Sequence, residues 1–279
     1  MAIVPTGEPK RVLVAGGGPA GLEAARVAAL RGHEVMLYEK RDKLGGQVNL
    51  ASVHPFKQEI SQVIKYLSLQ AQKAGVKLEL GREVTPELVS ELKPDVVIIA
   101  TGASPLRPSS LPGSEKDVVV TAWEVLDGHA AATARSVVIV GGGLVGCETA
   151  DFMAQTTDNL STVPTDVTVL EMLEDVALDG VAGPRHLLLE RLRQKPVQIL
   201  TKAEVTEILD DGVVFTRNGQ EESIRGVEYV ILAVGARPLD SLSAEIKDEV
   251  AEVHVIGDAK EPRRVLEATA AAAEIARKI

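Results

Sequence analysis

Short apolar runs alternate with alanine-rich segments of helical pattern along most of this chain. Runs with few polar residues lie at Val76–Leu80, Val96–Ala100, Val197–Leu200, Tyr229–Val234 and Val253–Ile256. Uniformly apolar runs of this kind predict buried parallel strands. Strands that alternate with helices predict βαβ units, and therefore an α/β fold.

Two long segments of the chain resemble each other. They are Arg11–Lys40 and Ser136–Met172, and each contains a β-branched apolar run, a glycine-rich turn, an alanine-rich helical pattern and a second apolar run that ends in an acid. An internal repeat indicates two copies of one structural unit. We therefore predict two Rossmann-like three-layer domains.

Other segments add local predictions. The proline-rich stretch 105–113 is the most loop-like part of the chain, and we place a domain crossing there. An Asp-Gly pair between apolar runs predicts an antiparallel hairpin over Glu204–Phe215. The last segment, Arg264–Ile279, has the pattern of an alanine-rich amphipathic helix.

Composition restricts the class of partner. The 279 residues suffice for two domains, and the net charge of -10 argues against nucleic acid and anionic membranes. The single cysteine, Cys147, excludes an internal disulfide, a CxxC pair, and a zinc or iron–sulfur cluster held by this chain alone. No apolar span is long enough to cross a bilayer, and we expect no metal site and a cytoplasmic protein.

The first glycine-rich turn has the chemistry of a dinucleotide loop. Gly16, Gly18 and Gly21 fit GxGxxG between a strand and a helix, with Pro19 and Ala20 inside the motif. The three glycines allow a tight turn, a close approach to pyrophosphate and close packing of helix on strand. The helix N-terminus offers N–H groups to phosphates. Glu39 ends the next strand, where an acid accepts hydrogen bonds from ribose.

The second turn repeats this pattern. Its candidate nucleotide contacts are Gly141, Gly143, Leu144, Val145, Gly146 and, as the terminal acid, Glu171. The interval to Glu171 is longer than in the first copy because a polar loop is inserted over Thr156–Thr165.

The residues near Glu171 bear on nucleotide specificity. A carboxylate at a strand end favours two free ribose hydroxyls and repels a 2′-phosphate. Glu174 and Asp175 follow Glu171, and no arginine lies in that loop. We therefore expect NAD(H) to be preferred over NADP(H). Two dinucleotide loops predict two bound dinucleotides, and a hydride donor paired with a flavin acceptor is the simplest interpretation.

Motifs over nearly the whole chain carry a family resemblance. They are VLVAGGGPAGLEAARVAALRGHEVMLYEK, LGGQ at Leu44–Gln47, PDVVIIATGA at Pro94–Ala103, VVTAWEVL at Val119–Leu126, VVIVGGGLVGCETA at Val137–Ala150, ILAVGARP at Ile231–Pro238 and VHVIGDAKEPRRVLEA at Val253–Ala268. With these motifs the chain resembles the FAD- and NAD(P)-binding module of the 2,4-dienoyl-CoA reductase, enoate reductase and trimethylamine dehydrogenase family.

The resemblance implies a domain organisation and an activity. An FAD-binding domain would comprise residues 1–110 and 252–279, interrupted by an NAD(H)-binding domain of residues 111–251. The implied activity is that of an FAD-dependent NAD(P)H oxidoreductase, which takes hydride from NADH to FAD and passes electrons to a partner or a small acceptor.

The resemblance also implies further cofactor contacts. Gly45, Gly46 and Gln47 would line the second phosphate and ring of the flavin, and Gly257 with Asp258 would bind its ribitol. The implied flavin contacts are completed by Lys40, Val84, Ala100, Thr101, Gly102, Arg263 and Val265. Val234 and Gly235 form the matching exit from the NAD(H)-binding domain.

Two departures from the family concern electron transfer. Members of this type usually begin with a TIM barrel that holds FMN and an iron–sulfur cluster, and the sequence contains no such barrel. The stretch LGGQVNLASVHPF also lacks the cysteine pair of the related disulfide reductases. Electrons must leave to another acceptor, and a partner that carries FMN and an iron–sulfur cluster is the natural expectation. The alternative is a non-redox subunit that binds ADP or another nucleotide as a scaffold.

No catalytic residue is clearly marked. His54 follows the LGGQ loop and either donates a proton near the flavin or packs. Glu148 either reaches a cofactor, as the resemblance implies, or caps or faces solvent. Cys147 lies in the first turn of the second helix, where a thiolate could be activated, but burial in a packed position is the favoured interpretation.

Overall fold

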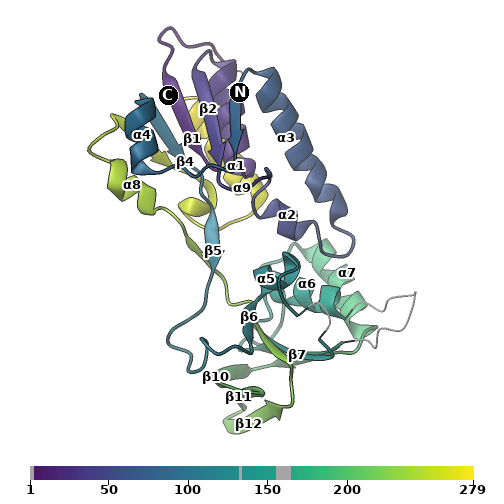
Figure 1. Cartoon of the computed structure of the whole chain (residues 1–279). Coiled ribbons are helices and arrows are strands. Elements are labelled where there is room, and N and C mark those ends of the chain that lie inside the picture. Colours follow the sequence, from purple (N-terminus) through teal and green to yellow (C-terminus); the bar gives the residue numbers. More distant parts are fainter. Residues whose placement is uncertain (1–2, 132–133, 155–164) are drawn as a thin grey trace. The chain divides into compact units, whose positions relative to one another are not determined.

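A computed structural model describes residues 3–131, 134–154 and 165–279 of the chain (Figure 1). The chain divides into two compact units. Unit 1 consists of Met1–Ser52, Glu59–Ser104 and Ala236–Ile279, and unit 2 consists of Val53–Gln58 and Pro105–Gly235. The polar loop predicted over Thr156–Thr165 lies, apart from Thr165, outside the described residues.

Unit 1 is built on a five-stranded parallel sheet in the order β15-β4-β1-β2-β3. The strands are β1 (Arg11–Ala15), β2 (Glu34–Glu39), β3 (Lys77–Leu80), β4 (Val96–Ile99) and β15 (Glu252–Val255). The helical elements are α1 (Pro19–Leu30), α2 (Val48–Ala51), η1 (Gln58–Ile60), α3 (Ser61–Lys73), α4 (Pro86–Leu92), α8 (Ser241–Ile246), η2 (Gly257–Ala259) and α9 (Val265–Ala276). A separate two-stranded ribbon pairs β5 (Ala103–Pro105) with β14 (Ala236–Pro238).

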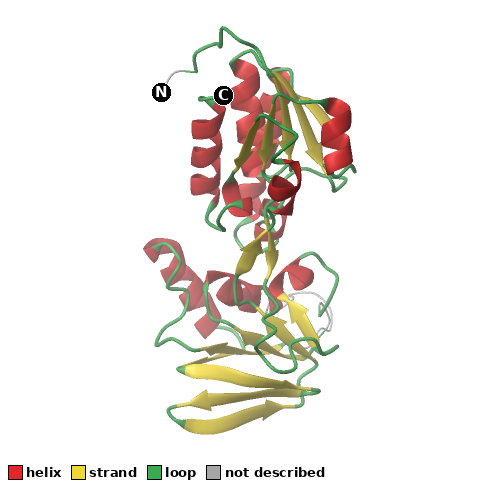
Figure 2. Ribbon diagram, turned by 90° about the vertical axis from the view of Figure 1, so that its left-hand side faces the viewer, coloured by secondary structure: helices red, strands yellow, loops and turns green. Residues whose placement is uncertain are grey.

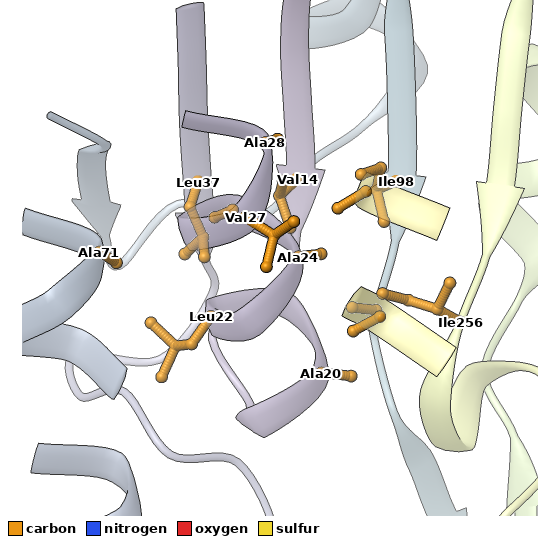
Figure 3. Packing of buried hydrophobic residues seen from close by; sticks show 14 of the residues in the cluster. Val14, Ala20, Leu22, Ala24, Val27, Ala28, Leu37, Ala71, Ile98 and Ile256 are labelled. Carbon is orange, nitrogen blue, oxygen red and sulfur yellow. The ribbon is translucent and has the colours of Figure 1, made fainter. Parts of the chain in front are cut away.

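Alternate residues of the central strand β1 face opposite sides of this sheet. Val12 and Val14 pack under α1, α3 and α9, as Figure 3 shows for Val14 beside Val27 and Ala24 of α1. Leu13 and Ala15 face the other side, where α4 and α8 cover the sheet. Both faces of the sheet are buried, which explains why the strands form continuous apolar runs in the sequence.

Unit 2 repeats the order of the four strands around the glycine loop, but its edge strand comes first rather than last in the chain. Its parallel sheet runs β6-β13-β7-β8-β9, with β6 (Val119–Thr121), β7 (Ser136–Val140), β8 (Asp166–Glu171), β9 (Val197–Thr201) and β13 (Tyr229–Leu232). The helices are α5 (Ala122–Leu126), α6 (Leu144–Met153) and α7 (Ala182–Arg193). The antiparallel strands are β10 (Ala203–Leu209), β11 (Gly212–Arg217) and β12 (Gln220–Arg225).

The antiparallel sheet forms the second cover of unit 2 (Figure 2). Val138 and Val140 of β7 pack against Ile208, Val213 and Phe215 on one face, while the helices cover the other face. The predicted hairpin is therefore present as β10 and β11. A third strand, β12, joins it that the sequence pattern did not reveal, because its residues are mostly exposed and polar.

The boundaries of the compact units differ from the predicted ones. The chain enters unit 2 at Pro105 rather than at residue 111, and it returns to unit 1 at Ala236 rather than at residue 252. The reason for the early return is burial: Leu242, Ile246 and Val250 pack in the core of unit 1 beneath α4. Residues 53–58 also belong to unit 2, which the sequence did not indicate.

None of the helices in the described part of the chain is long and apolar enough to cross a lipid bilayer.

Candidate functional site: two glycine loops

The first glycine loop leaves the carboxyl end of β1, the central strand, where the chain order of the sheet reverses. Gly16 has a φ of 112°, and a Cβ there would collide with the carbonyl group of Ala100. A Cβ at Gly21 would lie 3.1 Å from the carbonyl carbon of Gly16 and still closer to its oxygen. These two positions require glycine because backbone passes directly beside them.

The end of α1 that faces this loop is open. The N-cap residue, Gly18, supplies no side-chain cap, and a Cβ at Gly18 would meet no atom within 4 Å. The first helical residue is Pro19, so the N–H groups available to a ligand belong to Ala20 and Gly21. An uncapped helix N-terminus with clear space before it fits a phosphate group.

The acid predicted to bind ribose is held rigidly at the end of β2. Glu39 is only 8% exposed. Its Oε2 accepts a hydrogen bond of 2.7 Å from the N–H of Gly17, and its Oε1 accepts one of 2.9 Å from the N–H of Arg41. The carboxylate is thus fixed beside the glycine loop, with lone pairs left for ribose hydroxyl donors.

Two segments that are distant in sequence meet at this loop. The Gly45 N–H donates to the carbonyl of Gly17 at 2.9 Å, and a Cβ at Gly46 would lie 3.3 Å from the Cα of Gly18. From the C-terminal segment, a Cβ at Gly257 would come within 2.8 Å of the Cβ of Ala20. Small residues on all three segments keep the space in front of α1 clear.

Asp258 and Gln47 form a polar pair in the same unit. The Gln47 Nε2 donates to Asp258 Oδ2 at 2.9 Å, and the Arg263 N–H donates to Asp258 Oδ1 at 3.1 Å. Burial raises the pKa of the Asp258 carboxyl, while these two hydrogen bonds act in the opposite direction. The residues of unit 1 therefore fit FAD: a glycine cradle for phosphates, an acid for ribose, and a half-buried carboxylate for further hydroxyl groups.

The other residues predicted to contact the flavin lie in varied surroundings within unit 1. Lys40 is exposed and pairs with Glu83 at 3.7 Å, and Val84 packs at the edge of the core below α4. The Thr101 hydroxyl donates to the carbonyl of Leu239. Gly102 has a φ of 79°, and Val265 is the first residue of α9.

The second glycine loop reproduces the first within unit 2. Gly141 has a φ of 101°, and a Cβ at Gly146 would lie 3.0 Å from the carbonyl carbon of Gly141. Glu171 is 8% exposed. Its carboxylate accepts hydrogen bonds of 2.7 Å from Gly142 N–H and 2.8 Å from Leu173 N–H.

The contact of Gly141 with Ala233 corresponds to that of Gly16 with Ala100 in unit 1. A Cβ at Gly141 would lie 2.6 Å from the carbonyl oxygen of Ala233 and 3.5 Å from Val234 Cγ1. Gly235, with a φ of 104°, accepts a hydrogen bond of 3.0 Å from the Leu106 N–H. The backbone that closes the loop is therefore that of Ala233, one residue before the predicted Val234–Gly235 pair.

The N-terminus of α6 differs from that of α1 in one respect. Val145 lies exposed in the first turn, but the N–H of Leu144 already has an acceptor, Asp179 Oδ1, at 2.7 Å. No pattern in the sequence singles out Asp179, which lies in the loop after Glu171.

The two catalytic candidates, His54 and Glu148, come together in unit 2. His54 Nε2 lies 3.8 Å from Glu148 Oε2, and Lys57 Nζ forms an ion pair with the other carboxylate oxygen. Burial, followed by the charge of Lys57, lowers the pKa of His54 to about 4. Burial raises the pKa of Glu148, which Lys57 opposes. His54 is therefore neutral at pH 7, and its buried Nδ1 has no partner among the described residues.

Two further charged groups in unit 2 are not marked by any pattern in the sequence. Lys57 carried no recognisable signal, since its partner Glu148 is far away in sequence. Asp151 of α6 is 1% exposed and binds Arg191 at 2.8 Å and Lys195 at 2.5 Å, which ties α6 to α7.

Cys147 is a structural residue, as favoured from the sequence. It is fully buried, and burial raises the pKa of its thiol to about 12, with nearby carboxylates adding to the shift. Its Sγ lies 3.4 Å from the carbonyl oxygen of Gly142. The described residues include no group of His, Cys, Asp and Glu side chains that could hold a metal ion.

Each unit therefore contains a strand, a glycine loop, a helix N-terminus and a buried acid arranged as in dinucleotide-binding domains. Two such units in one chain are typical of the class of proteins that bind two dinucleotides. The chain belongs to the pyridine nucleotide-disulphide oxidoreductase family, whose model matches residues 10–272.

The chain is also similar to proteins that are named for an activity. The chain is 40% identical to bilirubin reductase of Mediterraneibacter gnavus (strain CC55_001C) over 93% of its own length and 39% of that protein. It is 38% identical to NADH oxidase of Thermoanaerobacter brockii, over 96% of this chain and 40% of that protein. The solved structure of a 2-naphthoyl-CoA reductase complex superposes with a TM-score of 0.91 at 31% identity, over 100% of this chain and 41% of that one.

These comparisons confirm the predicted family, fold and enzyme class. The family binds FAD and a pyridine nucleotide, and the enzyme class of the chain is FAD-dependent NAD(P)H oxidoreductase. The chain spans about two fifths of the length of each of these three proteins.

Proposed function

We propose that unit 1 binds FAD, that unit 2 binds NAD(H), and that the chain passes reducing equivalents from NADH through FAD to an acceptor outside its own residues. The observation that carries this proposal is the pair of buried acids, Glu39 and Glu171. Each accepts a 2.7 Å hydrogen bond from the second glycine of its loop, so each unit has an equivalent ribose-binding carboxylate. When bound, FAD supplies the hydride-accepting chemistry, and the chain supplies binding and orientation.

The assignment of FAD to unit 1 rests on its surroundings. Gly45 and Gly46 cross the first glycine loop and leave its helix N-terminus uncovered. Asp258 and Gln47 add a half-buried carboxylate and an amide to this unit, held together by a 2.9 Å hydrogen bond. A larger nucleotide with an additional polyol chain needs such extra contacts.

The preference for NAD(H) over NADP(H) rests on charge around Glu171. Its carboxylate would repel a 2′-phosphate and accept free hydroxyls. The nearby Arg185 is engaged by Asp175 at 2.5 Å and by the Val176 carbonyl at 2.8 Å. That arginine is therefore not available as a phosphate-binding cation without breaking these contacts.

The acceptor is proposed from the family and from the relatives. Members of the resembled family join this module to a barrel with FMN and an iron–sulfur cluster, and we propose a partner of that chemistry or a small electron acceptor. The relatives include a bilirubin reductase and an NADH oxidase, so a reductive role fits. A cytoplasmic location is proposed with this function, because NADH is drawn from the cytoplasmic pool.

The test is an anaerobic visible spectrum of the purified protein before and after addition of NADH or NADPH. We expect a flavin band near roughly 450 nm that NADH bleaches faster than NADPH does. A Glu171→Gln variant should raise the KM for NADH more than that for NADPH, with Glu174→Gln, an exposed carboxylate paired to Lys202, as its matched control.

Two results would contradict the proposal. A protein that stays colourless after incubation with FAD has no flavin site. A yellow protein that binds NADH without bleaching would leave the non-redox nucleotide scaffold as its function.

A further inference from the structure

A carboxylate occupies the N-terminus of α6, the part of unit 2 where a nucleotide phosphate would bind. Asp179 Oδ1 accepts a hydrogen bond of 2.7 Å from the Leu144 N–H. Both carboxylate oxygens lie 3.7 Å from the position of a Cβ on Gly143, the N-cap residue. The side chain therefore points at the helix end, in a position that is exposed to solvent.

The loop that carries Asp179 is anchored to the glycine loop. The Ala177 N–H donates to the carbonyl of Gly142 at 2.7 Å, and Val176 is buried against the same glycine. Arg185 fixes the loop from the other side through the Val176 carbonyl and Asp175. The position of the carboxylate thus follows from how residues 175–180 are folded.

Unit 1 provides an internal comparison. Its corresponding loop also runs from the acid Glu39 to a backbone hydrogen bond, from Gly45 to Gly17, of 2.9 Å. There the side chain two residues further on, Gln47, turns to Asp258 and leaves α1 free. The first residue of α1 is Pro19, which has no N–H to cap. The carboxylate on the helix end is peculiar to unit 2 within the described residues.

We propose that Asp179 competes with the nucleotide pyrophosphate for the N-terminus of α6 and thereby limits the affinity of unit 2 for its nucleotide. The inference rests on the proposed function of unit 2 and deepens it. A helix N-terminus attracts anions through its free N–H groups and its dipole. A pyrophosphate that contacts the Leu144 N–H must displace the carboxylate, and it remains close to a like charge afterwards.

This competition has a defined purpose in a hydride-transfer module. The nucleotide must dissociate after each turnover, and a carboxylate that recaptures the Leu144 N–H favours release. Asp179 is therefore a positioning residue that sets KM and product release, without contact to the reacting atoms.

The experiment uses FAD-loaded protein, so that unit 1 is filled, and ADP-ribose as the probe. Its dissociation constant is measured by calorimetry for the wild type, Asp179→Asn and Asp179→Ala, with Glu174→Gln as control for the loss of one negative charge in the same loop. Removal of one negative charge from the helix end that would hold the pyrophosphate should tighten binding about tenfold at low salt, and less at high salt. Adenosine, which has no phosphate, should bind all four proteins equally.

Each outcome has a definite meaning. Tighter binding of ADP-ribose by both Asp179 variants, with Glu174→Gln unchanged and a smaller ratio in salt, supports the inference. Binding to the variants that is equal to or weaker than that of the wild type, in proteins whose melting temperatures match, overturns the inference alone. ADP-ribose that binds to none of the four proteins overturns the nucleotide-binding role of unit 2 as well.

Discussion

Substitution of two glycines in the same loop separates folding from cofactor binding. Gly21 and Gly18 both belong to the first glycine motif, but their surroundings differ. A Cβ at Gly21 would lie 3.1 Å from the Gly16 carbonyl carbon and nearer still to its oxygen. A Cβ at Gly18 would meet nothing within 4 Å, and the backbone there is extended, with φ of -75° and ψ of -178°.

The expected magnitudes follow from these contacts. Alanine at Gly21 gains about 1 kcal/mol of helix propensity. Because the opposing atoms are backbone and cannot rotate away, the overpacking costs about 3 kcal/mol, at the upper end of its usual range. The net loss for Gly21→Ala is therefore about 2 kcal/mol, which corresponds to a fall of about 4–8 °C in melting temperature for a chain of this size. Gly18→Ala should change stability by less than about 0.5 kcal/mol.

The Gly18→Ala substitution should affect flavin affinity rather than stability. Its open side is where phosphate would approach the N-terminus of α1, so a methyl group there should weaken FAD binding about tenfold or more while the apoprotein remains as stable as the wild type. The assay is thermal melting of the flavin-free protein, together with fluorescence titration by FAD. The reasoning fails if Gly21→Ala melts with the wild type, or if Gly18→Ala binds FAD as tightly as the wild type does.

Three other predictions concern charged and titrating groups of unit 2. Asp151→Asn should lower the unfolding free energy by about 2 kcal/mol in a thermal melt, because it leaves Arg191 and Lys195 without their 1% exposed counter-charge. His54 should make the fold less stable as the pH falls from 6.5 towards 4: burial, then Lys57, lowers its pKa from 6.5 to about 4, so in that window only the unfolded chain takes up the proton. This linkage amounts to at most about 3 kcal/mol, and His54→Gln should flatten the slope in urea titrations. Cys147, whose thiol has its pKa raised to about 12 by burial, should resist iodoacetamide at pH 8 in the native protein and react when the chain is unfolded.

Controls make these results interpretable. Glu274→Gln removes an exposed ion pair with Lys278 and should leave the melt unchanged. Glu148, with its pKa raised by burial, acts against His54 as the pH falls, so the wild type and His54→Gln must be compared at each pH. Equal slopes in the two proteins, a stable Asp151→Asn, or rapid alkylation of the folded chain would each show that the corresponding group is less buried than the structure has it.

The repeated unit and its chemistry follow from local features of the sequence. The apolar run Val12–Ala15 is buried on both faces, since its alternate residues enter separate cores. This double burial explains the uninterrupted apolar pattern in the sequence. Gly21 and Gly146 are required by backbone five residues earlier in the chain, at Gly16 and Gly141. Glu39 and Glu171 each accept a hydrogen bond from the glycine loop that follows the neighbouring strand of the sheet. Such features follow from the geometry of one βαβ unit and can be read locally.

Tertiary structure alone decided the features that depend on distant partners. His54 and Lys57 lie in a segment flanked by unit 1 elements, yet they belong to unit 2 and meet Glu148 there. The return of the chain at Ala236 depends on whether α8 finds its apolar partners in one core or the other. Asp179 is an ordinary loop carboxylate in the sequence, and only the folded loop aims it at the Leu144 N–H. In each case the residue type permits several roles, and the partner that selects one of them is supplied by long-range packing.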